Sequence, residues 1–468
     1  MNLPVFAVIG HPNEGKSSVV ATLAENDSIR ISPTPGETMV STAYPVLVDG
    51  QPVITFVDTP GFQNPLQTLG WMRKYEGPDE ELLPRFLKEF ENDPGLAHER
   101  ELLRPVAEGA GVIYVLDASR PVRRVDLAEM EILRRTGRPR MAVLNCKTGE
   151  EAFLEEWKVE LRKHFNIVRT FNALRATFAE RVRLLESLRA LEQDWEKSLD
   201  RIVDAFTRDW FRRNRECAAL VCDFLGRVLV LSESATLGEG ENRARLESAL
   251  AAKLKERLRS EESRLHGHVC ALFRHEATLF DLPEHSVLHQ DLFARTTWRV
   301  LGLNRAQLVT AATAAGAATG VAVDLATLGT SLGVFAAVGG AITGLAALFK
   351  GEKLARHKIM GLELGQRTVR VGPVGTVQWM FILLDRFLLH YWYVIRWAHA
   401  LRDHGELSTE VLAEREKLEL NTPWDRPTRK LCADYFQARQ EGDDARLVGL
   451  EQELRRFIED ELKRLSFL

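Results

Sequence analysis

The sequence predicts an α/β domain with a mostly parallel sheet, followed by an all-α region. Short apolar runs alternate with helical stretches up to about residue 185, which is the pattern of parallel strands joined through helices. From about residue 175 onward, apolar residues recur at helical spacing and strand signals disappear. We therefore divide the chain into an α/β domain, a helical domain, an apolar helical hairpin and a helical C-terminal region, at residues 1–185, 186–304, 305–350 and 351–468.

Six short runs of apolar and β-branched residues predict the strands of the first domain. They are Leu3–Ile9, Ala43–Val48, Val53–Val57, Gly111–Asp117, Arg140–Asn145 and Ile167–Phe171. Asp49-Gly50 between the second and third runs predicts a hairpin. The fourth and fifth runs are continuously apolar, as expected of strands buried on both faces. Lys16–Ala24 is the predicted first helix, and residues 63–109, which are rich in proline, form a predicted insertion of unassigned role.

Composition excludes several classes of protein. The charge balance is 62 − 66 = −4, so no strong overall field attracts nucleic acid. Five scattered cysteines form neither a disulfide framework nor a zinc ribbon. The chain enters a strand-like run at Leu3 without a basic leader, which predicts no export. We expect a protein of the cytoplasm or of the cytoplasmic face of the inner membrane, where it would be peripheral or inserted.

Two motifs at strand ends predict binding of a nucleoside triphosphate. Gly10–Ser17 satisfies the pattern G-x-x-x-x-G-K-[ST] between a strand and a helix. Its glycines allow backbone N–H groups to surround phosphates, while Lys16 reaches the β- and γ-phosphates and Ser17 ligates Mg²⁺. Asp58-Thr59-Pro60-Gly61 ends the third predicted strand. There Asp58 can hold the magnesium shell and the Gly61 N–H can meet the γ-phosphate, whereas a plain Pro-Gly turn is the alternative.

With the run Thr34–Thr38, these motifs resemble the translation-factor-related small GTPases, and within them the Era/TrmE/EngA-like branch. The resemblance covers about the first 180 residues. It implies a Ras-like P-loop fold and Mg²⁺-dependent hydrolysis of GTP to GDP and phosphate. The implied catalytic residues are Lys16, Thr38 and Gly61, and the implied Mg²⁺ ligands are Ser17, Thr38 and Asp58. The implied nucleotide-binding residues are Asn13, Glu14, Gly15, Lys16, Ser17, Ser18, Asn145, Lys147, Asn172 and Ala173.

The chain departs from this family at the guanine-reading motif and at the catalytic position. Asn145 matches the first residue of Asn-Lys-x-Asp, but Cys146 and Thr148 replace the Lys and the Asp. Because the Asp carboxylate accepts hydrogen bonds from guanine, its loss should reduce selectivity for guanine over adenine. Phe62 follows Gly61, where Ras-like enzymes place a water-orienting glutamine. We therefore expect slow intrinsic hydrolysis, raised by a partner or by formation of a homodimer.

Two groups could compensate for Phe62. In several members of the branch, an asparagine matching Asn13 holds a K⁺ ion that supplies positive charge, and a loop-shaping role is the alternative for Asn13. Glu37, Glu76 and Glu80 are the candidate acids for positioning water.

Three features after the first domain allow more than one interpretation. Residues 307–323 and 325–349 carry no charge and are rich in Ala and Gly, so they form either membrane-inserted helices or a buried helical hairpin. The aromatic-rich stretch Thr376–Leu401 suits a helical core slightly better than a membrane interface. The basic cluster Arg212-Arg213-x-Arg215 is most often a solvated helix face.

Three functional hypotheses follow. The first is a nucleotide-driven switch that binds GTP and GDP, with the helical region responding at the membrane surface or through an integral-membrane protein. The second is a membrane-associated scaffold that binds nucleotide with negligible hydrolysis. The third is an RNA- or ribosome-associated assembly GTPase, which ranks last because no strongly basic domain follows the first domain.

Overall fold

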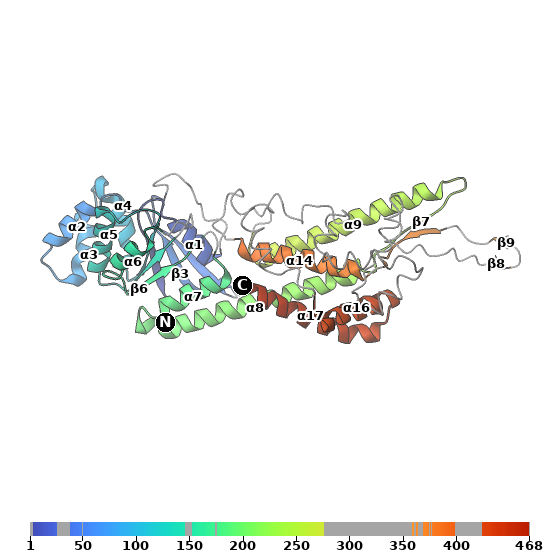
Figure 1. Cartoon of the computed structure of the whole chain (residues 1–468). Coiled ribbons are helices and arrows are strands. Elements are labelled where there is room, and N and C mark those ends of the chain that lie inside the picture. Colours follow the sequence, from blue (N-terminus) through green and yellow to red (C-terminus); the bar gives the residue numbers. More distant parts are fainter. Residues whose placement is uncertain are drawn as a thin grey trace.

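The computed structural model describes residues 3–25, 38–48, 50–145, 152–173, 176–275, 358–359, 362–363, 368–373, 375, 377–397 and 424–467. Within these residues the chain is elongated, with an α/β domain at one end and a helical domain at the other (Figure 1). Helix α8 (Gln193–Val228) runs from one to the other. Its 36 residues span about 54 Å at 1.5 Å per residue.

The α/β domain contains the predicted mixed, mostly parallel sheet. Its strands are β1 (Val5–Ile9), β2 (Thr42–Val48), β3 (Gln51–Asp58), β4 (Gly111–Leu116), β5 (Arg140–Leu144) and β6 (Ile167–Thr170). They lie in the order β2-β3-β1-β4-β5-β6, with β2 antiparallel to β3 and the remaining neighbours parallel. Gly50, with φ 75°, provides the left-handed conformation between β2 and β3, so the predicted hairpin is confirmed.

Alternate side chains along the strands enter two separate cores. On one face, Phe6 and Val8 of β1 join the apolar residues of α1 (Lys16–Ala24), α7 (Phe178–Arg189) and α8. On the other face, Ala7 and Ile9 join those of α2 (Pro65–Lys74), α5 (Arg124–Arg135) and α6 (Leu154–Leu161). The first core continues along α8 into the helical domain, so the two domains share buried apolar surface.

The insertion after β3 is helical and covers the second face of the sheet. It contains α2, a 3₁₀ turn at Asp79–Glu81, α3 (Leu82–Glu89), a second 3₁₀ turn at Pro94–Leu96 and α4 (Ala97–Ala107). The insertion therefore contains three α-helices.

The helical domain is built from α8, α9 (Arg243–Leu272), α14 (Gln378–Arg396), α16 (Arg426–Glu441) and α17 (Asp444–Ser466). Trp379, Tyr391 and Trp392 of α14 are at most 1% exposed, so the core interpretation of this aromatic helix is confirmed. None of the described helices combines the length and hydropathy that a membrane crossing requires. The predicted hairpin at 305–350 lies outside the described residues.

The expectation that strands end with the first domain was wrong, because short strands follow it. β7 (Glu233–Thr236) pairs antiparallel with β10 (Thr368–Val371), and β8 (Lys358–Ile359) pairs with β9 (Leu362–Glu363). These strands are two to four residues long, too short to show a period of two. β7 and β10 are stabilised by pairing between segments far apart in the sequence, which a local pattern does not reveal.

Candidate functional site

The loop Gly10–Ser17, here called the P-loop, turns sharply between β1 and α1. A Cβ atom at Gly10 would lie 2.1 Å from the carbonyl oxygen of Val115, so only glycine allows the loop this close to β4. Asn13 and Gly15 adopt the left-handed region with φ values of 65° and 90°. The backbone is thus bent where a phosphate-binding loop must curve around its ligand.

Helix α1 begins with its N-terminal amides free of any side-chain cap. Gly15 is the N-cap and has no side chain to accept a hydrogen bond from the first turn. By contrast, α7 begins with a capping box formed by Thr177 and Glu180. The Lys16 Nζ donates to the carbonyl oxygen of His11 at 3.0 Å, which places the ammonium group over the P-loop. Uncapped amides beside a cation form a site suited to an anion.

Ser17 and Asp58 fit the magnesium site that the resemblance implies. The Ser17 Oγ donates to Asp58 Oδ2 at 2.7 Å, which brings two oxygen ligands together. Asp58 is 4% exposed, and within the described part of the chain its Oδ1 has no hydrogen-bond partner. Burial raises the pKa of Asp58, although Ser17 and Lys16 oppose this effect. A divalent cation bound here would supply positive charge to the phosphates and compensate this carboxylate.

The segment after Asp58 lies directly against the P-loop. A Cβ atom at Gly61 would lie 2.6 Å from the backbone nitrogen of Pro12, so glycine is required for this approach. The Phe62 N–H donates to the carbonyl oxygen of Gly10 at 3.3 Å. The Phe62 side chain is fully buried in the core beneath the sheet, so it does not present a group to water.

Asn145 links the P-loop to the segment after β6. Its Nδ2 donates to the Glu14 carbonyl at 3.0 Å, and its Oδ1 accepts from the Ala173 N–H at 3.1 Å. Thr22 of α1 donates to the Ala173 carbonyl at 2.8 Å. The structure thus brings together residues that the motifs place more than a hundred positions apart. Asn172 is half-buried beside Ala173, and Lys147 lies outside the described residues.

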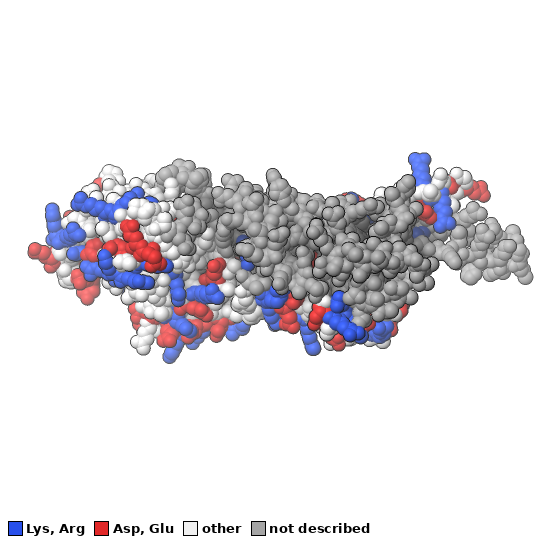
Figure 2. Space-filling view, in the orientation of Figure 1, with Lys and Arg blue, Asp and Glu red and all other residues white. Residues whose placement is uncertain are grey.

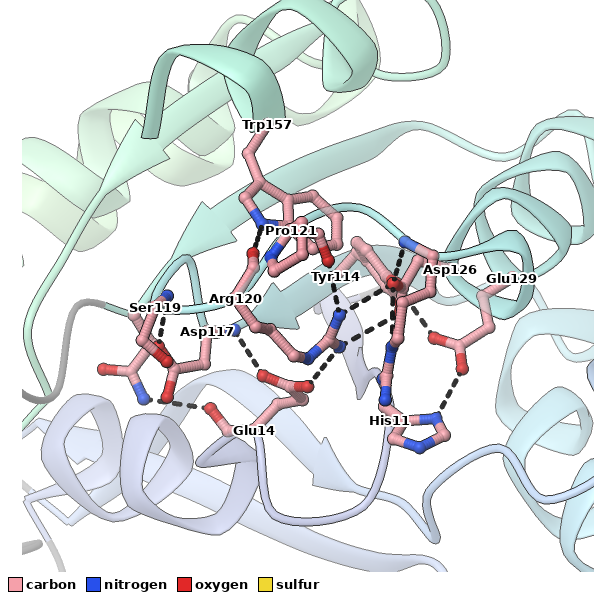
Figure 3. Close-up of polar contacts among 12 residues, drawn as sticks. His11, Glu14, Tyr114, Asp117, Ser119, Arg120, Pro121, Asp126, Glu129 and Trp157 are labelled. Carbon is pink, nitrogen blue, oxygen red and sulfur yellow. Dashed lines mark hydrogen bonds and ion pairs between the residues drawn. The ribbon is translucent and has the colours of Figure 1, made fainter. Parts of the chain in front are cut away.

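The side chain of Glu14 turns away from the loop and forms an ion pair (Figure 3). Arg120 donates to Glu14 Oε1 at 2.6 Å and to Asp126 Oδ2 at 2.7 Å. The Asp117 N–H also donates to the Glu14 carboxylate. Burial opposes ionisation of Asp126, but hydrogen bonds from Arg120 and Arg123 hold its pKa below the usual value. The P-loop is therefore tied to the β4–α5 connection, a role for Arg120 that no motif predicted.

His11 provides a second tie on the same side of the P-loop (Figure 3). Its Nδ1 lies 2.8 Å from Oε1 of Glu129, and Tyr114 donates to the other oxygen of Glu129 at 2.9 Å. Glu129 is fully buried, and burial raises its pKa while the His11 and Tyr114 hydrogen bonds oppose the rise. The side chains of His11 and Glu14 thus both reach the β4–α5 region rather than the ligand position.

The C-terminal end of α1 is held by arginines from the other helices. Glu25 follows α1 with φ 48° and is 5% exposed. Its carboxylate lies 2.8 Å from Arg181 of α7, 2.7 Å from Arg213 of α8 and 3.2 Å from Arg274 after α9. Asp209 of α8 also pairs with Arg213. The expectation of a solvated face was therefore wrong for Arg213, which is 3% exposed because Glu25 and Asp209 neutralise it.

The remaining predicted site residues are more scattered. Thr38 opens the described segment 38–48 and is half-buried, and Ser18 is buried in the first turn of α1. Glu76 and Glu80 are exposed after α2, beyond the segment that touches the P-loop, and Glu37 lies outside the described residues. Their candidacy for positioning water stays a prediction.

Comparison with known proteins agrees with this geometry. Residues 158–464, well over half of the chain, match the family described as "Domain of unknown function (DUF3482)". The chain belongs to this DUF3482 family. Residues 5–146 match the family described as "50S ribosome-binding GTPase". With the P-loop and the sheet order, this match makes the first domain of this DUF3482 protein a P-loop GTPase domain.

Two curated relatives match less than a third of this chain. GTPase Der of Thermotoga petrophila is 27% identical over 139 residues, which are 30% of this chain and 27% of that protein. GTPase Der of Thermotoga sp. strain RQ2 is 25% identical over 139 residues, again 30% of this chain and 27% of that protein. This DUF3482 chain therefore spans about a quarter of the length of the curated relatives it matches.

Solved structures similar to this chain include two of Era. Aquifex aeolicus Era bound to GDP and aluminium fluoride is 20% identical, with 41% of this chain and 58% of that chain covered and a TM-score of 0.30. Era in complex with MgGDPNP and nucleotides of 16S ribosomal RNA is 16% identical, with 58% and 90% covered and a TM-score of 0.31.

Proposed function

We propose that this protein is a Mg²⁺-dependent nucleotide switch in which the state of the GTPase domain is transmitted to the DUF3482 helical domain. The observation that carries the proposal is the position of Glu25. Helix α1 has Lys16 and Ser17 at one end and Glu25 just after the other, roughly 13 Å apart by helix geometry. A displacement of α1 on nucleotide binding therefore acts on the arginines of α7, α8 and the end of α9.

Arg274 supports this proposal with a second contact. Besides Glu25, its guanidinium donates to the carbonyl oxygen of Leu47 in β2 at 3.0 Å. β2 follows Thr38, the threonine that the family resemblance places on Mg²⁺ and the γ-phosphate. One arginine next to α9 thus touches the elements on both sides of residues 26–37. Movement on either side changes the same ion-pair cluster.

Titration calorimetry of the full chain tests the nucleotide part of the proposal. A non-hydrolysable GTP analogue, its ATP counterpart and GDP would be titrated with Mg²⁺, first in KCl and then in NaCl. Preference for the guanine nucleotide is the expected result, despite Cys146 and Thr148. Equal or ATP-favouring binding would contradict the proposal. A gain in nucleotide affinity confined to KCl would assign a K⁺ site to Asn13. Equal affinities in KCl and NaCl would leave Asn13 as a loop-shaping residue.

A scaffold that binds nucleotide with negligible hydrolysis is the second candidate. Burial of Phe62 favours it, because the position that orients water in Ras-like enzymes offers no polar group here. Steady-state phosphate release with and without vesicles containing anionic phospholipid separates the two. Turnover below about 10⁻⁴ s⁻¹ under every condition, under the intrinsic Ras rate, supports the scaffold. The vesicle arm also tests the proposed membrane contact, which depends on residues outside the described part of the chain.

An RNA-associated role is the third candidate, since the matched GTPase family is described as ribosome-binding and one similar Era structure holds 16S ribosomal RNA. The described charges argue against it. On the face shown in Figure 2, basic and acidic side chains are interspersed over the GTPase end rather than gathered into a basic patch. Co-sedimentation with ribosomal subunits that depends on the bound nucleotide would reverse this ranking.

A further inference from the structure

The segment that follows Phe62 is held by a buried carboxylate from the insertion. Glu99 of α4 is fully buried. Its Oε1 accepts hydrogen bonds from the backbone N–H groups of Gln63 at 2.8 Å and Asn64 at 2.5 Å. Asn64 is also held through its side chain, which donates to the Gly95 carbonyl at 2.8 Å. The backbone two and three residues after Gly61 is thus fixed from outside the nucleotide motifs.

The same helix also contacts the segment that follows Thr38. The Ser41 hydroxyl donates to the carbonyl oxygen of Glu101 at 2.7 Å. Helix α4 therefore holds the chain three residues after Thr38 and two residues after Gly61. In the family resemblance, Thr38 and Gly61 are the groups that recognise the γ-phosphate.

Glu99 is more than a cap for the start of α2. Accepting the Asn64 and Gln63 amides engages one oxygen, while within the described residues Oε2 is buried without a hydrogen-bond partner. A buried carboxylate oxygen without a partner is costly, and a neutral side chain could accept two amide hydrogens at lower cost. A carboxylate accepts amide hydrogen bonds more strongly than a neutral oxygen does, so it suits a hold on this one segment of backbone.

We propose that Glu99 is a positioning residue for recognition of the γ-phosphate. By fixing Gln63 and Asn64, Glu99 keeps Gly61 against Pro12, where its N–H can meet the γ-phosphate and distinguish GTP from GDP. The insertion at 63–109 thereby becomes part of the nucleotide sensor. This inference rests on the proposed nucleotide switch, but it concerns discrimination between GTP and GDP rather than binding itself.

The test compares E99Q with a matched control on the same helix. E108Q makes the same change of charge at an exposed residue at the end of α4. For each full-length protein, calorimetry would measure the affinity for a non-hydrolysable GTP analogue and for GDP, both with Mg²⁺. We expect E99Q to lower the analogue affinity by about tenfold, as loss of a charge-assisted contact predicts, and to leave the GDP affinity within about twofold. E108Q should match the wild type for both.

A second variant keeps the test decisive if E99Q fails to fold. S41A removes the other hydrogen bond to α4, at a half-buried position. We expect a smaller loss of affinity than in E99Q, again confined to the GTP analogue. Equal losses for both nucleotides, or no loss in a folded variant, would overturn the role of Glu99 while leaving the switch intact. A wild-type protein that binds neither nucleotide would refute the proposed function and this inference with it.

Discussion

Charged groups lie at both ends of helix α1, but their surroundings differ. At the N-terminal end, Lys16 lies over an uncapped helix start, and Asp58 Oδ1 has no partner among the described residues. At the other end, both oxygens of Glu25 are engaged by arginines from three other segments. The first arrangement suits a charged ligand, whereas the second satisfies charge with charge inside the protein.

This difference separates the residues that would bind nucleotide from those that would transmit the nucleotide state to the helical domain. A charge that serves a ligand should affect affinity when it is removed and should affect folding little. A charge that joins two domains should affect folding, because its loss leaves the partner charges buried without compensation. Substitutions at the two ends of α1 should therefore produce effects on different measurements.

The largest effect is expected from E25Q. It leaves Arg181 and Arg213, each at most 5% exposed, with Asp209 as the nearby compensating carboxylate that the structure describes. Breaking a buried ion pair from one side costs about 3–5 kcal/mol of unfolding free energy, to be measured by urea denaturation. E155Q, at an exposed residue paired with Lys158, is the control and should unfold like the wild type. An E25Q protein as stable as the control would show that the cluster does not join the domains.

The next effect is expected from K16A, and it should appear in binding. Loss of the ammonium group removes the charged contact to the phosphates, so affinity for GTP and GDP should fall by about 100-fold. Unfolding without ligand should change less than in E25Q, because the described hydrogen bond of the Lys16 Nζ is to a carbonyl of its own loop. Calorimetric titration and urea denaturation of the same preparation provide both values. Full nucleotide affinity in K16A would remove the basis for the P-loop assignment.

The smallest effect is a pH dependence of magnesium binding. Burial raises the pKa of Asp58, so this carboxylate binds a proton at a higher pH than an exposed aspartate. Mg²⁺ requires the ionised form, so affinity should fall by up to about tenfold per pH unit once the pH drops below that pKa. Without ligand, the raised pKa of Asp58 means that the folded state favours the neutral carboxyl. The free energy of unfolding of the ligand-free protein should therefore rise, not fall, as the pH drops. D58N should abolish the pH dependence in Mg²⁺ titrations; an unchanged slope would exclude Asp58 as the responsible group.

The α/β domain and its phosphate motifs are predictable from the sequence because their determinants are local. The six strands begin and end within two residues of the predicted bounds, and the first helix was predicted at its observed bounds. Ser17 and Asp58 meet because the ends of parallel neighbours β1 and β3 lie at one edge of the sheet. Asn145 and Ala173 meet for the same reason at β5 and β6.

The residues that sequence reasoning missed act over long separations. Glu25 meets Arg213 across 188 positions, and nothing near either residue marks the pair. Glu99 lies 36 positions from Gln63 in an insertion without a motif. The doublet Arg212-Arg213 illustrates the limit, because the Arg212 side chain is 46% exposed and that of its neighbour is buried. Adjacent residues on a helix point in different directions, and only the tertiary fold decides which of them is covered.

Hydrogen exchange of the full chain, measured without nucleotide, with GDP and with a non-hydrolysable GTP analogue, tests transmission from α1 most directly. The P-loop amides at 10–18 should become protected with either nucleotide. We expect the amides of α8 around Asp209–Arg213, and those at 273–275, to exchange differently between the GDP and GTP-analogue states. Identical exchange in these helical segments, with all differences confined to 10–64, would contradict it and leave Glu25 as a purely structural ion pair.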